Sequence, residues 1–265
     1  MSDMFCFQCQ ETARNEGCTR VGVCGKKPDV ANAQDLLIWN CKGLSAILMA
    51  LREAGKSVDA YYNHLITGSL FMTITNANFD MEAIEARTAE VLKAKQDCLA
   101  QLDSTDNMPE AALWQSSDRD EWHTKSETIG VLSTEDEDVR SLRELITYGL
   151  KGLSAYSKHA NVLLHDDDNV DLFIQKALAA TLDDSLGVPE LVDLTLATGE
   201  AGVQGMALLD AANTDSYGHP EVTEVSIGVR DNPGILISGH DLRDLEMLLE
   251  QTAGTGVDVY THSEM

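Results

Sequence analysis

Four cysteines near the amino terminus have the spacing of a metal-binding or cluster-binding site. They form a C-x2-C-x8-C-x5-C pattern with glycines between them, and they are Cys6, Cys9, Cys18 and Cys24. A segment this short has little hydrophobic core of its own, so packing does not explain four thiols there. An iron–sulfur cluster, a structural zinc ion and a pair of disulfides are the three chemistries that would use them.

The surroundings of the cysteines rank these three alternatives. The first residues contain neither a basic nor an apolar leader segment, which predicts a cytoplasmic protein whose thiols stay reduced. Zinc sites favour two tight C-x2-C pairs, whereas only the first pair is tight here, so the spacing favours iron–sulfur and leaves zinc open. Four nearby basic residues would raise the reduction potential of a cluster, unless they are ordinary solvated surface: Arg14, Arg20, Lys26 and Lys27.

The composition excludes some partners. The chain of 265 residues has 44 acidic and 19 basic side chains and a formal net charge of -25. Such a chain repels nucleic acid and anionic membrane surfaces, and no apolar run approaches the ~20 residues that span a bilayer. Few aromatic residues and many Ala, Leu, Glu and Asp residues favour helices.

The elements between the cysteines and residue 218 are predicted to be helices in two related sets. Apolar residues at helical spacing predict a helix from Pro28 to just before Gly55, and a second helix that begins with a capping box of Thr134 and Glu137. Lys-Gly-Leu-Ser-Ala occurs in both helices, at 42–46 and 151–155, and the helices near 81–103 and 189–210 also match loosely. We therefore predict two helical bundles in tandem.

Several polar or reactive residues in this region are assigned no site. Cys41 and Cys98 lie on apolar helix stripes and are predicted to be buried. Residues 104–133 are predicted to form a surface connection, and the run His165-Asp166-Asp167-Asp168 a solvated turn rather than a cation site. No partner at ligand spacing accompanies three histidines, His64, His123 and His159.

The last part of the sequence predicts a different architecture. A short strand at 234–238, a helix at 241–252 and a strand at 257–261 form a parallel βαβ unit. Because parallel strands end at the same sheet edge, His240 and Glu264 should lie near each other on one rim. The competing interpretation is that His240 only begins a helix that Asp241 caps, and that Glu264 is simply loop.

Taken together, these motifs resemble the hybrid cluster proteins, a family also called hydroxylamine reductases or prismane proteins. The resemblance runs from Met4 to Met265 and rests on the cysteine pattern, the repeated Lys-Gly-Leu-Ser-Ala helices and two segments, 238–242 and 259–265. It implies a mainly α fold of two tandem related helical bundles with an N-terminal Fe–S loop, followed by the start of an α/β Rossmann-like parallel-sheet domain. The corresponding domains are 1–28, 29–218 and 219–265.

The resemblance also implies cofactors, partners and an activity. Cys6, Cys9, Cys18 and Cys24 would hold a [4Fe-4S] cluster, and His240 and Glu264 would be two ligands and catalytic residues of a hybrid [4Fe-2O-2S] cluster. The enzyme would be an oxidoreductase that reduces hydroxylamine to ammonia and water, with nitric oxide as a further candidate substrate and a redox protein as electron donor. Nickel carbon monoxide dehydrogenases are similar in architecture, but their amino-terminal cluster arrangement differs.

The sequence departs from the family in its length. The family's remaining hybrid-cluster ligands lie in a carboxy-terminal half, whereas this sequence stops at Met265. We therefore expect a fragment, a truncated reading frame or one piece of a split protein, inactive in catalysis by itself. Two other functions stay open, an electron-transfer module that uses only the [4Fe-4S] cluster and a structural zinc-binding domain.

Overall fold

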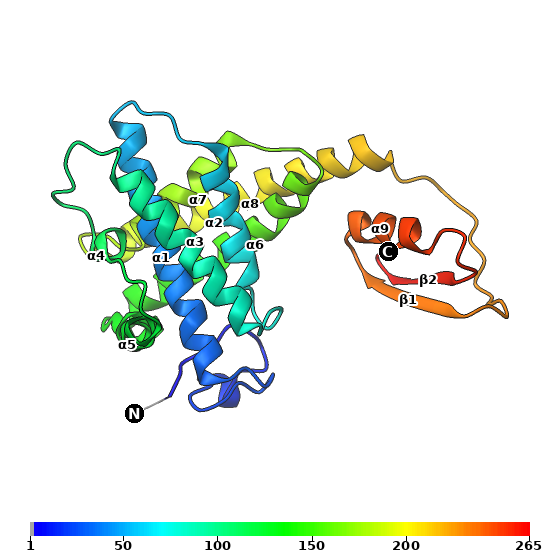
Figure 1. Ribbon diagram of the computed structural model, residues 1–265, viewed down its shortest axis with the longest axis horizontal. Helices are drawn as coiled ribbons and strands as arrows, with labels where there is room; N and C mark the ends of the chain where they lie inside the picture. The colour runs from blue at the N-terminus through cyan, green and yellow to red at the C-terminus, as the bar shows by residue number, and fades with distance from the viewer. Residues whose placement is uncertain (1–2) are drawn as a thin grey trace.

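The computed structural model describes residues 3–265, so the first two residues of the predicted segment 1–28 lie outside the described part. Packed helices up to Tyr217 form the main body, and a small unit of two strands and one helix lies at one end of it (Figure 1). An extended segment joins the two. The prediction of a mainly α protein followed by the start of an α/β domain is confirmed.

The first long helix, α1 (Pro28–Glu53), follows directly from its sequence. Proline fits the first helical turn because its missing N–H would have no intrahelical partner there, and Asp29 places a negative charge at the positive end of the helix dipole. The helix stops before Gly55, whose φ of 72° is in the left-handed region that glycine adopts without strain. Its apolar stripe is fully buried, with Leu37, Leu44, Ile47 and Leu48 at 0% exposure.

Two further helices complete the first repeat, α2 (Ala60–Met72) and α3 (Met81–Leu99). Asp59 and Asp80 precede them, and each carboxylate accepts a hydrogen bond from a backbone N–H of the first turn. Because α2 and α3 both contact α1, the three helices bury their apolar faces together.

The second repeat has the same order, with a longer third helix: α6 (Glu137–Val162), α7 (Asp168–Ala180) and α8 (Val188–Tyr217). The helices α1 and α6 both have 26 residues, and α2 and α7 both have 13. The repeats interlock, because α2 packs against α6 and α7 packs against α1.

The predicted capping box of Thr134 and Glu137 is wrong. Asp136 caps α6 instead, since its carboxylate accepts hydrogen bonds of 3.0 Å from the backbone N–H groups of Asp138 and Val139. A carboxylate directly before the helix is a stronger acceptor than a threonine hydroxyl two residues further back.

Residues 104–133 are mostly exposed on the surface of the helical repeats, as predicted, but they also form helices that the prediction of a connection omits. They contain α4 (Glu110–Leu113), α5 (Arg119–Ile129) and the short 3-10 helix η2 (Val131–Ser133). Trp122 of α5 is only 8% exposed and packs in a cluster with Leu36 of α1. Because most residues of this segment are polar, its few buried apolar residues form no recognisable pattern in the sequence.

Cys41 and Cys98 are both 0% exposed within the main core, as predicted. Burial raises the pKa of Cys41 to about 12 and also raises the pKa of Cys98, so neither thiol ionises readily.

The carboxyl-terminal unit consists of β1 (Gly234–Gly239), α9 (Leu242–Thr252) and β2 (Asp258–Ser263). The strands are parallel, in a register that pairs Gly234 with Asp258 and Gly239 with Ser263. This confirms the predicted βαβ unit.

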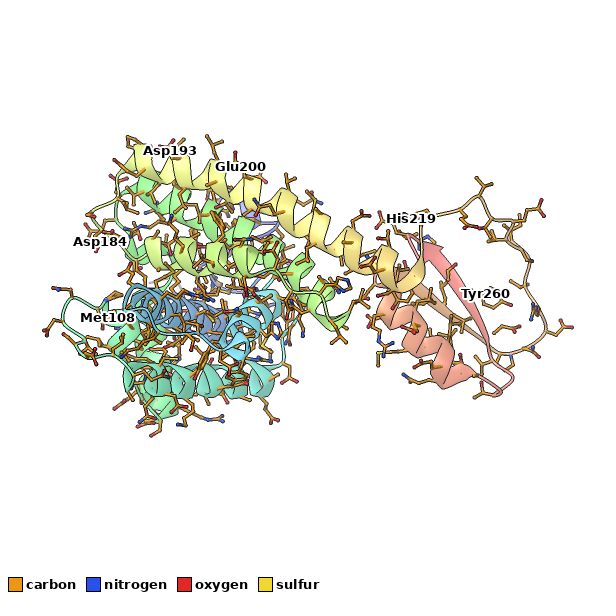
Figure 2. All side chains as sticks on the ribbon, turned by 90° about the horizontal axis from the view of Figure 1, so that it is seen from above. Met108, Asp184, Asp193, Glu200, His219 and Tyr260 are labelled. Carbon is orange, nitrogen blue, oxygen red and sulfur yellow. The ribbon has the colours of Figure 1, made fainter. Side chains whose placement is uncertain are left out.

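The extended segment before β1 is tied to the sheet at Tyr260. The hydroxyl of this residue accepts a hydrogen bond of 2.9 Å from the backbone N–H of Arg230. Figure 2 shows Tyr260 on the small unit, and His219 where α8 gives way to the extended segment. None of the helices among the described residues has the length and apolarity that crossing a bilayer requires.

Candidate metal centre

The amino-terminal segment folds into a loop that brings the first and third cysteines together. Cys6 N–H donates to the carbonyl of Cys18 at 3.1 Å, and Cys18 N–H donates back to the carbonyl of Cys6 at 2.8 Å. This antiparallel bridge holds the two backbones side by side. Cys9 lies just beyond, where its carbonyl accepts the N–H of Thr12 at 3.1 Å in a turn.

The fourth cysteine sits in a glycine turn. Gly25 N–H donates to the Gly22 carbonyl at 2.8 Å, and Gly25 has a φ of 88°. A Cβ on Gly22 would lie 3.1 Å from the sulfur of Cys24, so glycine is what allows this close approach of backbone to thiol.

The four thiols differ in exposure. Cys18 is buried, Cys6 and Cys9 are half-buried, and Cys24 is exposed. Burial is the main cause that raises the pKa of Cys6. Within residues 3–265, no three His, Cys, Asp or Glu side chains are gathered closely enough to hold a metal ion. The loop therefore pairs Cys6 with Cys18 and leaves the complete set of four unassembled.

The chemistry of this donor set nevertheless fits an iron–sulfur cluster. All six cysteines of the chain are free thiols, and four of them lie in one short loop. Thiolates are the ligands that such clusters use.

The four basic residues of this segment divide into two kinds. Lys26 is only 2% exposed, and its ammonium donates at 2.7 Å to both the Gln34 side chain and the Thr75 carbonyl. Arg14, Arg20 and Lys27 are exposed. Lys26 is thus a fixed positive charge beside the loop, and the other three are solvated surface.

His240 and Glu264 each follow the last residue of a parallel strand. Gly239 and Ser263 are the last paired residues, so His240 and Glu264 come one register step beyond, at the same sheet edge. Both side chains are exposed. Two ligands do not complete a four-iron site, so the residues of this chain do not by themselves fit the hybrid cluster.

Sequence reasoning missed the part that His159 plays. Its Nδ1 lies 2.8 Å from the Asp241 carboxylate, and its ring centroid lies 5.7 Å from that of His240. The residue belongs to α6, so this contact ties the second helical repeat to the start of α9. No spacing in the sequence signals a contact between residues so far apart in the chain.

The acidic run after α6 contacts side chains of other helices and caps the next one. The carboxylate of Asp166 lies 3.0 Å from His64 Nε2, His165 Nε2 lies 3.1 Å from the Asp215 carboxylate, and Asp167 caps α7. The run pairs with neighbouring side chains, as a solvated turn does.

The family model and the similar proteins found by comparison agree on one family. The model of the Prismane/CO dehydrogenase family matches residues 4–265. The hydroxylamine reductase of Desulfovibrio desulfuricans is 60% identical over 262 residues, which are 99% of this chain and 48% of that protein. Hydroxylamine reductase 2 of Clostridium acetobutylicum is 55% identical over 99% of this chain and 50% of its own length.

A third relative agrees with these two. The hydroxylamine reductase of Clostridium perfringens is 56% identical over 99% of this chain and 49% of its own length. The chain thus spans about half the length of the curated relatives it matches. With nearly every residue covered by the family model, the chain belongs to the Prismane/CO dehydrogenase family.

Proposed function

We propose that this chain provides the amino-terminal half of a cytoplasmic iron–sulfur oxidoreductase that reduces hydroxylamine. The observation that carries this proposal is its identity of 50–60% to proteins named hydroxylamine reductase, over 99% of its residues. The four free thiols of the amino-terminal loop supply the matching donor set, Cys6, Cys9, Cys18 and Cys24.

In this proposal the four thiolates hold a [4Fe-4S] cluster, which, when bound, passes single electrons from a donor protein toward the substrate site. The bridge between Cys6 and Cys18 holds two of these ligands in adjacent backbones, and Cys9 and Cys24 would supply the other two. The buried ammonium of Lys26 favours the more negative, reduced state, which raises the reduction potential.

Reduction of hydroxylamine to ammonia and water consumes two electrons and two protons as the N–O bond breaks. His240 and Glu264 would be ligands of the hybrid [4Fe-2O-2S] cluster where that reaction occurs, with nitric oxide as a second candidate substrate. Because these two residues do not suffice for that cluster, we propose that the chain by itself does not turn hydroxylamine over.

A second candidate function is electron transfer alone. It is favoured by the contrast between the two sites, since the loop offers four thiols and the rim offers one imidazole and one carboxylate. In that case the chain carries a [4Fe-4S] cluster and exchanges electrons with a partner without catalysis.

Elemental analysis of anaerobically purified chain separates these functions from a zinc domain. We expect brown protein with about four iron and four sulfide per chain. Colourless protein with one zinc ion would contradict both redox functions. Assay of the same sample with hydroxylamine and a chemical reductant should give no turnover; turnover would show that this half suffices.

A further inference from the structure

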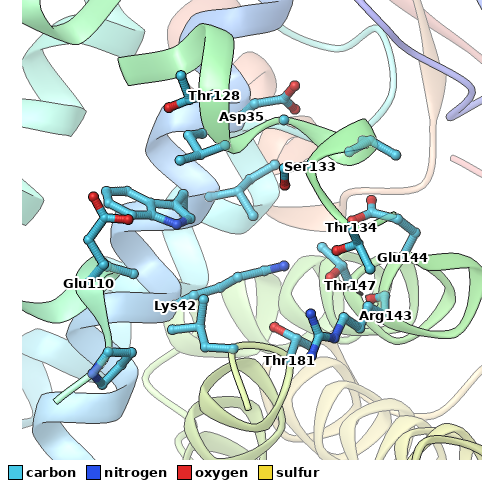
Figure 3. Close-up of a pocket in the computed structure, with 18 of the residues that line it drawn as sticks. Asp35, Lys42, Glu110, Thr128, Ser133, Thr134, Arg143, Glu144, Thr147 and Thr181 are labelled. Atoms are coloured by element: carbon cyan, nitrogen blue, oxygen red, sulfur yellow. Dashed lines mark hydrogen bonds between the residues drawn. The ribbon is translucent and has the colours of Figure 1, made fainter. Parts of the chain in front are cut away.

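A cavity of about 530 Å³ lies between the two helical repeats, walled by α1, α6 and the segment that contains α4, α5 and η2 (Figure 3). The repeats contribute equivalent residues to it. Asp35 stands seven residues before Lys42 on α1, and Glu144 stands seven residues before Lys151 on α6. All four side chains line the cavity.

The two lysines have different surroundings. The ammonium of Lys151 is buried and donates at 3.1 Å to the Gln8 side chain and to the Thr73 carbonyl. In contrast, Lys42 has only charges near it, with no hydrogen-bond acceptor among the described residues. Burial lowers the pKa of Lys42; the charge of Glu144 opposes this, and the charge of Arg143 adds to it. The wall of the cavity therefore carries the ammonium of Lys42, which has no hydrogen-bond acceptor among the described residues.

Arg143 adds a second positive charge to the cavity wall. Its Nη2 donates at 2.9 Å to the Asp183 carbonyl and the Asp184 carboxylate. Its Nε is buried and has no partner, and its side chain is only 11% exposed. Figure 3 shows the ammonium of Lys42 and the guanidinium of Arg143 directed to the same part of the cavity. Because this Nε has almost no accessible surface, Arg143 offers a ligand in the cavity the charge of its guanidinium rather than this N–H.

The inner charges of the cavity are three basic side chains and two acidic ones, in a chain whose formal net charge is -25. The other acidic groups at its edge are exposed: Glu110, Glu135 and Asp184. We propose that the cavity binds a small oxyanion, which accepts a hydrogen bond from Lys42 Nζ and lies beside the guanidinium charge of Arg143.

Two observations favour an anion over a cation. No group of acidic or histidine ligands that could hold a metal ion occurs among residues 3–265. Burial and the charge of Glu144 also raise the pKa of Asp35 to about 7, so near neutral pH this carboxyl carries a proton for part of the time and repels an anion less. The site needs no iron–sulfur cluster, so it stands or falls independently of the redox function.

Calorimetric titration of the whole chain with sulfate, at constant ionic strength set with NaCl, tests this site. We expect saturable binding that Lys42→Met weakens roughly tenfold or more, because a charge-assisted hydrogen bond is lost. Lys42→Arg should keep the binding. Equal affinity of Lys42→Met and the unaltered chain, or no saturable binding by the unaltered chain, would overturn the proposal.

Two further variants show whether weaker binding comes from the site itself, rather than from loss of any lysine charge or from misfolding. Lys93→Met deletes a lysine whose side chain is 66% exposed on α3 and should leave the affinity for sulfate unchanged. Glu144→Gln, made and compared in an Asp35→Asn background so that Asp35 cannot ionise in compensation, removes a competing negative charge and should tighten binding roughly two- to fivefold. Because this change is in the opposite direction, loss of folding cannot imitate it, and unchanged or weaker binding by folded Glu144→Gln in that background contradicts the site.

A parallel titration with acetate distinguishes the two kinds of ligand that could supply the oxyanion, an inorganic anion and a carboxylate. Tighter binding of sulfate indicates a tetrahedral inorganic oxyanion, and tighter binding of acetate indicates a carboxylate. Both results support the proposal when Lys42→Met weakens them.

Discussion

The two helical repeats carry the same string of residues in different environments. On α1 the outer face is covered by α4 and α5, which pack against it, whereas the equivalent face of α6 has no such cover. Leu36 is accordingly 2% exposed, and its counterpart Leu145 is 53% exposed. The comparison teaches that a repeated sequence fixes helix length and the shared inner face, while the segment inserted between the repeats decides which outer positions are buried.

The largest expected difference is at that pair of leucines. Leu36→Ala should lower the free energy of unfolding by about 2–5 kcal/mol, because it leaves a cavity beside Leu92 and Trp122. Leu145→Ala should change it by no more than about 0.5 kcal/mol. Urea unfolding followed by circular dichroism measures both, and equal losses would show that α6 is covered like α1.

The repeated glycine gives the next largest difference. A Cβ on Gly43 would lie 2.0 Å from the Ala111 carbonyl oxygen of α4, whereas a Cβ on Gly152 meets no atom within 4 Å. Gly43→Ala should therefore cost about 1–3 kcal/mol of overpacking. Gly152→Ala should raise stability by about 0.5–1 kcal/mol, since alanine favours helix. Thermal melting of the two variants should shift in opposite directions; shifts of the same sign would contradict the asymmetry.

The paired acidic residues predict a pH dependence. Burial first, and then the charge of Glu144, raise the pKa of Asp35 from 3.8 to about 7, and the charges of Lys151, Lys26 and Lys42 oppose this. The folded chain thus holds the proton more tightly than the unfolded chain. The stability that protonated Asp35 contributes is full below about pH 4 and is lost as the pH rises through about 7.

Asp35→Asn tests the direction of this pH dependence because asparagine stays neutral at every pH. Relative to the unaltered chain it should gain on the order of 1 kcal/mol between pH 4 and pH 7, a value reduced by solvent in the open cavity. Glu144→Gln should move the pH range over which stability is lost to lower pH, since it removes the second cause of the raised Asp35 pKa. Denaturant unfolding at several pH values measures both, and a difference that stays constant with pH would refute the assignment.

The repeated serine gives the smallest expected effect. Both side chains are 0% exposed, but Ser45 Oγ donates to the Cys41 carbonyl at 2.8 Å, while Ser154 Oγ has no partner. Ser45→Ala should cost about 0.5–1.5 kcal/mol, and Ser154→Ala should be neutral or stabilising by up to about 1 kcal/mol. Chemical unfolding of both variants measures this difference. A larger loss of unfolding free energy for Ser154→Ala than for Ser45→Ala would mean that the Ser154 hydroxyl is hydrogen-bonded in solution.

Much of the fold follows from local sequence. Periodicity, proline and glycine predict α1 correctly, and short strands around an amphipathic helix predict the parallel βαβ unit. The sequence did not predict that α4 and α5 form and are anchored by a few buried residues, because apolar residues such as Ala111 and Trp122 stand among many polar ones. The division into domains at residues 28 and 218 stays a prediction.

The candidate site was predictable only in part. The spacing identifies the thiols but not that Cys24 is exposed while Cys18 is buried, since this depends on how the loop packs on α1. No feature of the sequence predicts that Lys26, Lys95 and Lys151 are buried, because the charged end of a lysine side chain normally reaches solvent. Burial lowers the pKa of Lys95 to about 7, a shift that depends on tertiary packing alone.

Iron content of two matched cysteine variants tests the central claim, that the amino-terminal thiols hold an iron–sulfur cluster. Cys9→Ser removes a proposed ligand from the loop, and Cys98→Ser changes a buried cysteine of the helical core that has no part in the site. We expect anaerobically purified Cys9→Ser to lose its iron while it keeps the helical circular dichroism, and Cys98→Ser to retain about four iron per chain. Full iron content in Cys9→Ser would contradict the account.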